Sequence, residues 1–189
     1  MLQKRLLLGF FALTLSAFAA NAAEPTHVTV PDGPTVDIAL PDKWTMTSNP
    51  VGPAVTLSLS QPGGPDFNVL LTILPPSRTH ALNTAESVHD FVVEQGNRAL
   101  SSATQTKLEM TEVRGAGGTA YLYHVTDRNP EKGPGDYREA DQGAMLLGKN
   151  IVSITILTHP GAGDIVELAK GAIASMRISS PVPEVTPKS

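Results

Sequence analysis

The chain has 189 residues, with 14 basic and 18 acidic side chains, a net charge of −4 and no cysteine. This mild acidity argues against nucleic acid and anionic membrane surfaces as partners, because both would repel the chain. Without cysteine there can be no disulfide and no cysteine-linked lipid anchor.

The first 22 residues have the three parts of a secretory signal peptide. Lys4 and Arg5 form a basic start, residues 6–18 are almost continuously apolar, and Ala20-Asn21-Ala22 is a small-x-small cleavage pattern. The apolar run is shorter than the ~20 residues that span a membrane. We therefore expect a cleaved leader over residues 1–22 and a soluble, periplasmic protein, with secretion beyond the outer membrane left open.

Alternating apolar and polar residues predict a first group of extended segments after the leader. These are residues 27–30, 35–40, 54–60 and 67–74. Val55, Leu57 and Leu59 share one face of the third segment, which is typical of an antiparallel strand with one buried side. Residues 61–66 form a hairpin loop. The fourth segment is apolar on both faces, so we expect it near the centre of the sheet, under a helix.

Two amphipathic helices are predicted. The first follows Asn83, which we expect to be the N-cap with Glu86 as its capping-box partner. Its apolar stripe is formed by Ala85, Val88, Phe91, Val92, Ala99 and Leu100. The second helix has Asp164 and Glu167 as its expected capping box. Its apolar stripe is formed by Ile165, Leu168, Ala169, Ala172, Ile173 and Met176.

Four more strands are predicted between the two helices. They are residues 106–114, 119–127, 137–147 and 151–158. Residues 115–118 and 148–150 form tight turns, whereas residues 128–136 form a long polar loop. The proline-rich residues 179–189 are predicted to be a disordered tail, which leaves residues 23–178 as a single domain.

The order of strands, helix, four strands and helix predicts an α+β fold, an antiparallel β-sheet meander flanked by two helices. This order, with Leu40-Pro41-Asp42-Lys43-Trp44 and Gly118-Thr119-Ala120-Tyr121, resembles the PsbP-like superfamily and, within it, the DcrB-like bacterial envelope proteins. The resemblance covers roughly Val36 to Ile178. It implies an α/β/α sandwich and an accessory or binding role, because members mostly lack catalytic centres. It identifies no functional residue in this chain.

Glu86, His89 and Asp90 place three potential metal ligands within one turn of the first helix. No cysteine and no second histidine at ligand spacing accompany them, so a solvated helix face is the favoured interpretation. We expect neither a metal nor a cofactor.

Two other patterns are interpreted as structural. Gly115–Gly118 stands between two strands and lacks the context of a phosphate-binding loop, so it is a hairpin turn. Tyr121 and Tyr123 share one strand face, where burial under a helix is favoured over a binding patch.

A small periplasmic hydrolase is the alternative enzyme hypothesis, with Ser153 or Ser58 as nucleophile and His159 as base. No Gly-x-Ser-x-Gly elbow is present, and serines that alternate along a strand fit the polar face of a sheet better. The favoured hypothesis is that the protein is not an enzyme.

The long polar loop is the best candidate for a recognition surface, because loops on a rigid sheet often carry binding residues. Its charged residues and the aromatic residue that follows it are Arg128, Glu131, Lys132, Asp136 and Tyr137. We expect an exported, non-enzymatic accessory or binding protein whose partner is another envelope protein. A periplasmic immunity-type protein that neutralises a toxin is a further alternative, and the oligomeric state is left open.

Overall fold

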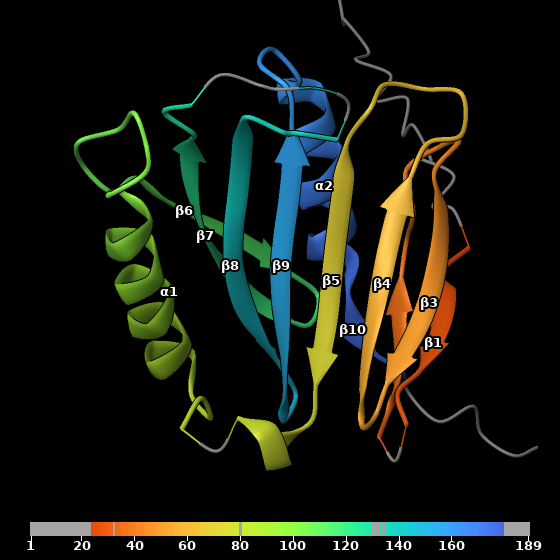
Figure 1. Cartoon of the computed structure of the whole chain (residues 1–189). Coiled ribbons are helices and arrows are strands. Elements are labelled where there is room, and N and C mark those ends of the chain that lie inside the picture. Colours follow the sequence, from red (N-terminus) through yellow and green to blue (C-terminus); the bar gives the residue numbers. More distant parts are fainter. Residues whose placement is uncertain (1–23, 32, 80, 130–132, 134, 180–189) are drawn as a thin grey trace, which may run out of the picture.

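Seven strands of the computed structural model form one antiparallel sheet in the order β3-β4-β5-β9-β8-β7-β6 (Figure 1). They are β3 (Thr45–Val51), β4 (Ala54–Ser60), β5 (Asn68–Leu74), β6 (Met110–Gly115), β7 (Gly118–Thr126), β8 (Glu139–Leu147) and β9 (Asn150–Thr158). The expected meander is present in two parts, β3 to β5 and β6 to β9. The chain passes through α1 (Ala85–Ala99) to the far edge strand β6 and returns to β5 by way of β9.

The structure describes residues 24–179 apart from residues 32, 80, 130–132 and 134. The predicted leader over residues 1–22 and the tail from residue 180 onward lie outside the described residues. Ser179, which was expected to begin the tail, is held by β2, since its N–H donates to the Thr35 carbonyl at 2.9 Å. Within the described part of the chain, no helix has the length and apolar character that crossing a membrane requires.

A second, three-stranded sheet joins the two ends of the described chain. It consists of β1 (Thr26–Thr29), β2 (Thr35–Ile38) and β10 (Arg177–Ile178), in the order β1-β2-β10. Asp37 in the middle strand lies 2.7 Å from His27 Nδ1 and accepts a hydrogen bond from Arg177 Nε at 3.2 Å. The Ser179 hydroxyl also donates to this carboxylate. The buried Asp37 therefore links the first and last strands of the fold.

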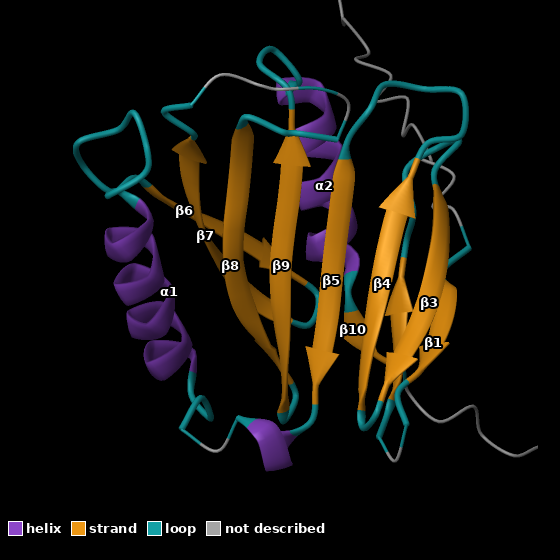
Figure 2. Cartoon of the chain, in the orientation of Figure 1, coloured by secondary structure: helices purple, strands orange, loops and turns teal. Residues whose placement is uncertain are grey.

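The two helices lie on opposite faces of the large sheet (Figure 2). α1 packs on β7 and β8, whereas α2 (Gly163–Ser175) packs on β6, β7 and β9 and on β2 of the small sheet. Ala144 lies in the core under α1 and its neighbour Met145 lies in the core under α2. Successive residues of a strand point to opposite faces, so this pair marks the two sides of the sheet. The predicted α+β architecture with flanking helices is confirmed.

The two sides of the sheet have cores of different extent. The larger core fills the space between the large sheet, the small sheet and α2, and its largest fully buried members include Ile38, Leu57, Leu59, Leu71, Leu122, Ile154, Ile156 and Ile173. The smaller core lies under α1 and contains Val88, Val92, Tyr123, Ala144 and Ile151. Tyr123 is 6% exposed and Tyr121 packs against the same cluster, which confirms their core interpretation.

The N-terminal cap of α1 differs from the prediction by one residue. Thr84, not Asn83, is the N-cap, and its hydroxyl accepts from the Ser87 N–H at 3.1 Å. The Thr84 N–H donates in return to the Ser87 hydroxyl at 3.1 Å. Glu86 lies in the first turn, where its charge complements the helix dipole but does not complete the capping box.

α2 also begins without the predicted capping box. Ala162 is its N-cap and no side chain caps it, while Asp164 lies within the first turn. The predicted apolar stripe of α1 is wrong at Ala85 and Phe91, which are both exposed, Phe91 at 37%. The predicted stripe of α2 is wrong at Leu168, which is 45% exposed. Ala169, Ala172 and Ile173 are at most 2% exposed, so the buried strip of α2 is narrower than its predicted apolar stripe.

Candidate functional site

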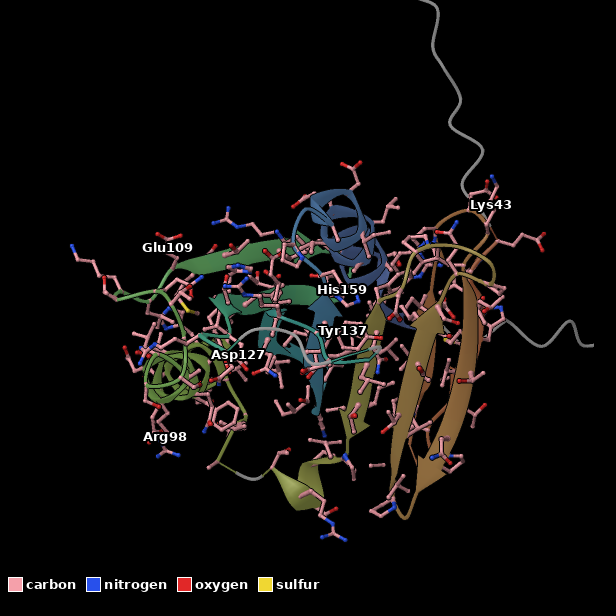
Figure 3. All side chains as sticks on the ribbon, turned by 45° about the horizontal axis from the view of Figure 1, so that its top comes forward. Lys43, Arg98, Glu109, Asp127, Tyr137 and His159 are labelled. Atoms are coloured by element: carbon pink, nitrogen blue, oxygen red, sulfur yellow. The ribbon has the colours of Figure 1, made fainter. Side chains whose placement is uncertain are left out.

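The loop singled out by the sequence ends in a side-chain cluster at one end of the large sheet. Tyr137 contacts Asp66, which lies in the β4–β5 connection. It also contacts His159, which follows β9 directly (Figure 3). These residues are far apart in the sequence, but their three connections leave the sheet at the same end, at the top of Figure 1. The cluster therefore joins three loops.

Each oxygen of the Asp66 carboxylate has its own partner. The Tyr137 hydroxyl donates to Oδ1 at 2.8 Å, and His159 Nε2 lies 3.3 Å from Oδ2. The rings of Tyr137 and His159 are also in contact, with centroids 5.1 Å apart and a tilt of 46°. The side chain of Asp66 is 55% exposed and that of His159 is 32% exposed, so the cluster lies at the surface.

These contacts favour the charged form of Asp66 and the neutral form of Tyr137. The hydrogen bond from Tyr137 is the main reason why the pKa of Asp66 lies below its ordinary value of 3.8, and His159 and the Gly135 N–H lower it further against partial burial. Burial raises the pKa of Tyr137 above 10.0, and the Asp66 carboxylate raises it further. At neutral pH the cluster therefore consists of a carboxylate anion that accepts from a neutral phenol.

The start of the same loop is fastened to the segment that follows α1. The Arg128 guanidinium donates through Nη2 to the Ala103 carbonyl at 2.8 Å, and the Arg128 N–H donates to the Ser102 carbonyl at 3.1 Å. The Asp127 N–H donates to the Arg138 carbonyl at 2.8 Å and closes the base of the loop. Both ends of the loop are thus held by the folded core.

The structure describes three of the five predicted binding residues, Arg128, Asp136 and Tyr137. Glu131 and Lys132 lie outside the described residues. Arg128 and Asp136 are exposed, whereas Tyr137 is half-buried. With the two residues that contact Tyr137, they form what we call the loop-end surface: Asp66, Arg128, Asp136, Tyr137 and His159.

Sequence reasoning missed Asp66 and considered His159 only as a catalytic base. The pairing of β5 with β9 brings these two residues together. Asn68 is opposite Leu157 in that antiparallel pair, so the same register carried two positions further sets Asp66 opposite His159. An aspartate and a histidine in separate loops have no sequence spacing that would identify them as one site. The only signal in the sequence was that each lies at the end of a predicted strand.

A small hollow of about 200 Å³ lies beside Tyr137. It is bounded by Ala99 and Ser102 at the end of α1 and by Val125 and Ala140 on the sheet. Pockets for drug-sized ligands usually occupy about 300–1,000 Å³. The loop-end surface is therefore better suited to contact with a partner surface than to enclosing a small molecule.

The serines of the hydrolase hypothesis do not meet His159. Ser153 lies on β9 itself, and a rise of about 3.3 Å per residue separates it from His159 by about 20 Å. Ser58 is opposite Leu70, which is opposite Thr155, so it lies two strands away and well below His159. The arrangement provides no nucleophile beside the imidazole.

The potential metal ligands on α1 are also not gathered into a site. His89 Nδ1 lies 3.2 Å from the carboxylate of its neighbour Asp90, and the His89 ring meets Tyr121 edge-on with centroids 5.0 Å apart. Over the residues that the structure describes, no group of three or more histidine, aspartate or glutamate side chains could hold a metal ion.

Comparisons with known proteins identify the fold. The sequence matches no protein-family model and no curated protein. The structure is similar to the solution structure of cyanobacterial PsbP (CyanoP) from Synechocystis sp. PCC 6803, with 16% sequence identity and a TM-score of 0.50. The match covers 87% of this chain and 98% of that chain. The chain therefore has a PsbP-like α+β fold, and a shared fold does not by itself transfer a function.

Proposed function

We propose that the chain is an exported, non-enzymatic accessory protein of the cell envelope, of the DcrB-like kind, and that it binds another envelope protein through the loop-end surface. The contact of Asp66 with both Tyr137 and His159 carries this proposal. It fastens the end of the long polar loop to two other connections. A fixed loop has less conformational entropy to lose on binding than a loose one, so more of the contact energy becomes affinity.

The residue types of the loop-end surface also favour a protein partner. Tyrosine and arginine are enriched among the residues that contribute most to protein–protein binding. The Tyr137 hydroxyl is held by its hydrogen bond to Asp66. The exposed Arg128 and Asp136 lie at the two ends of the loop. In such interfaces a buried aromatic anchor lies at the centre and polar or charged residues form the rim.

The proposal is tested by capturing partners of the tagged, exported protein from envelope extract and identifying them by mass spectrometry. The partner is then purified, and its affinity is measured for the parent chain and for two variants. One variant is Tyr137→Ala, and the other replaces residues 129–136 with Gly-Asn, which keeps the Arg128 contacts to the α1 end. We expect both variants to weaken binding at least tenfold while the near-UV circular dichroism spectrum is retained.

Arg114→Ala is the matched control. Arg114 is exposed on the edge strand β6, where it pairs only with Glu112 among the described residues. We expect this variant to bind as the parent does. Unchanged affinity in a folded loop-shortened variant would contradict the proposal and place the interface on another surface.

A further inference from the structure

An apolar hollow lies between α1, the sheet and the short helix η1 (Pro76–Arg78), and we call it the α1 cavity. It measures about 540 Å³. Its walls come from Leu74 at the end of β5, Ile151 at the start of β9 and Phe91 on α1. Figure 1 shows η1 as the yellow-green turn at the bottom of the sheet, where β5 ends and β9 begins. The α1 cavity is at the opposite end of the sheet from the loop-end surface.

The α1 cavity is open to the surface and is not an enclosed void. Cores are packed nearly as densely as organic crystals, with few voids larger than a water molecule. The α1 cavity, however, reaches into the smaller core, because Ala144 and Ile151 belong to both. Its volume lies within the ~300–1,000 Å³ of known ligand pockets. The space under α1 therefore has the dimensions of a binding site.

The chemistry of the walls is divided between an apolar interior and a polar opening. Aliphatic side chains and the Phe91 ring make up most of the lining. Ser153 adds a hydroxyl that has no hydrogen-bond partner among the described residues. Arg78 and Ala81 line the cavity but are exposed, so they stand at its opening. No carboxylate is among the lining residues, and Arg78 is their one charged member.

This combination points to one class of ligand. An alkyl chain would fill the apolar interior, since each buried CH₂ group contributes favourably to the free energy of transfer from water. The guanidinium of Arg78 makes no ion pair with another described residue and would attract an anionic headgroup at the opening. We propose that the α1 cavity binds a single-chain amphiphile with an anionic headgroup, such as a fatty-acid carboxylate, with the chain inside and the headgroup beside Arg78.

The proposal is tested by calorimetric titration of the full-length exported protein, purified without detergent. The probes are octanoate, decanoate and dodecanoate, each below its micelle concentration, with dodecyltrimethylammonium as a cation of the same chain length. We expect one saturable site, an affinity that rises about threefold to fourfold for each added CH₂ group, and weaker binding of the cation than of dodecanoate. The absence of saturable binding would overturn the proposal.

Two pairs of variants locate the ligand. Ala81→Trp fills the opening from an exposed position and should abolish binding, whereas Ala116→Trp, in the exposed β6–β7 turn, should bind as the parent does. Arg78→Glu should reverse the preference between dodecanoate and dodecyltrimethylammonium. Arg98→Glu, near the other end of α1, should leave the preference unchanged.

The outcomes separate the two parts of the proposal. Equal binding by the parent and a folded Ala81→Trp variant would place the ligand elsewhere. An unchanged preference in Arg78→Glu would overturn the headgroup assignment. The proposal does not rest on partner binding, and the loop variants described above are expected to titrate with dodecanoate as the parent does.

Discussion

At the scale of single residues, buried charge was the feature hardest to foresee. Asp37 and Asp141 are each only 5% exposed, which is costly for a carboxylate unless it is paired. Asp37 is paired with His27 and Arg177 within the small sheet, and Asp141 lies 3.2 Å from His124 Nδ1 on the neighbouring strand. Each buried carboxylate thus ties adjacent strands together.

His124 should make the stability of the fold depend on pH. Its hydrogen bond with Asp141 is the main cause that raises the pKa of His124 above 6.5, and the charges of Asp141 and Glu139 act in the same direction. Burial and the nearby Lys170 on α2 oppose this. The folded state therefore holds the His124 proton more tightly than the unfolded state. This stabilisation is complete below pH 6.5 and is lost as the pH rises through the pKa of the folded state.

We expect the free energy of unfolding in urea to be lower at about pH 8.5 than at about pH 5.5, and His124→Gln to reduce this difference. The pKa values of Asp37 and Asp66 are shifted the other way, below 3.8. Their contribution is present above pH 3.8 and is lost only as the pH falls through their folded-state values, so it is equal at both test conditions. A pH dependence unchanged by His124→Gln would contradict the assigned role.

At the scale of elements, only part of the predicted apolar stripe of α2 is buried against the sheet. Ile173 and Leu168 lie on one helix and belong to the same predicted apolar stripe, but their exposed fractions are 1% and 45%. Ile173→Ala should lower the free energy of unfolding by about 2–5 kcal/mol, because it leaves a cavity in the larger core. Leu168→Ala should change it by less than about 0.5 kcal/mol.

Urea titration monitored by fluorescence measures both substitutions. Trp44 is the only tryptophan, is 6% exposed and packs on Phe67 with ring centroids 4.6 Å apart, so unfolding exposes it. Similar losses of stability in the two variants would show that Leu168 also packs in the core.

The edge strand β3 was missing from the sequence analysis for a related reason. Nearly all residues of Thr45–Val51 are exposed, so the segment lacks the alternation that marks a strand with one buried face. It is a strand because it pairs along its length with β4. Pro50 is tolerated because an edge strand has one side without a hydrogen-bonded neighbour.

At the scale of the whole molecule, the leader remains a sequence-based prediction. The described structure begins at residue 24, and β1 begins at Thr26, so cleavage after Ala22 would remove none of its strands. Amino-terminal sequencing of the exported protein should find a start immediately after Ala22. Ala22→Leu should slow cleavage, because signal peptidase requires a small residue there. An exported protein that still begins with Met1 would contradict the prediction.

The topology of the large sheet determined where the loop-end surface lies. β5 and β9 are separated by α1 and three strands in the sequence, but they pair in the middle of the sheet. Their pairing sets the β4–β5 connection beside His159, and β8 on the other side of β9 brings Tyr137 to the same place. The long polar loop was predicted from its composition, whereas its contacts depended on this non-local pairing.

The sequence by itself determined most of the local structure, the α+β class and the position of the long loop. Alternation and helical periodicity record which side of an element is buried, and this information lies within a few neighbouring residues. The tertiary structure decided the pairing of β5 with β9, the burial of Asp37 and Asp141, and the exposure of Leu168. It also determined the position and lining of the α1 cavity, whose walls come from β5, η1, α1, β8 and β9. Each of these depends on which surfaces meet, and residues far apart in the chain leave no periodic signal of their contact.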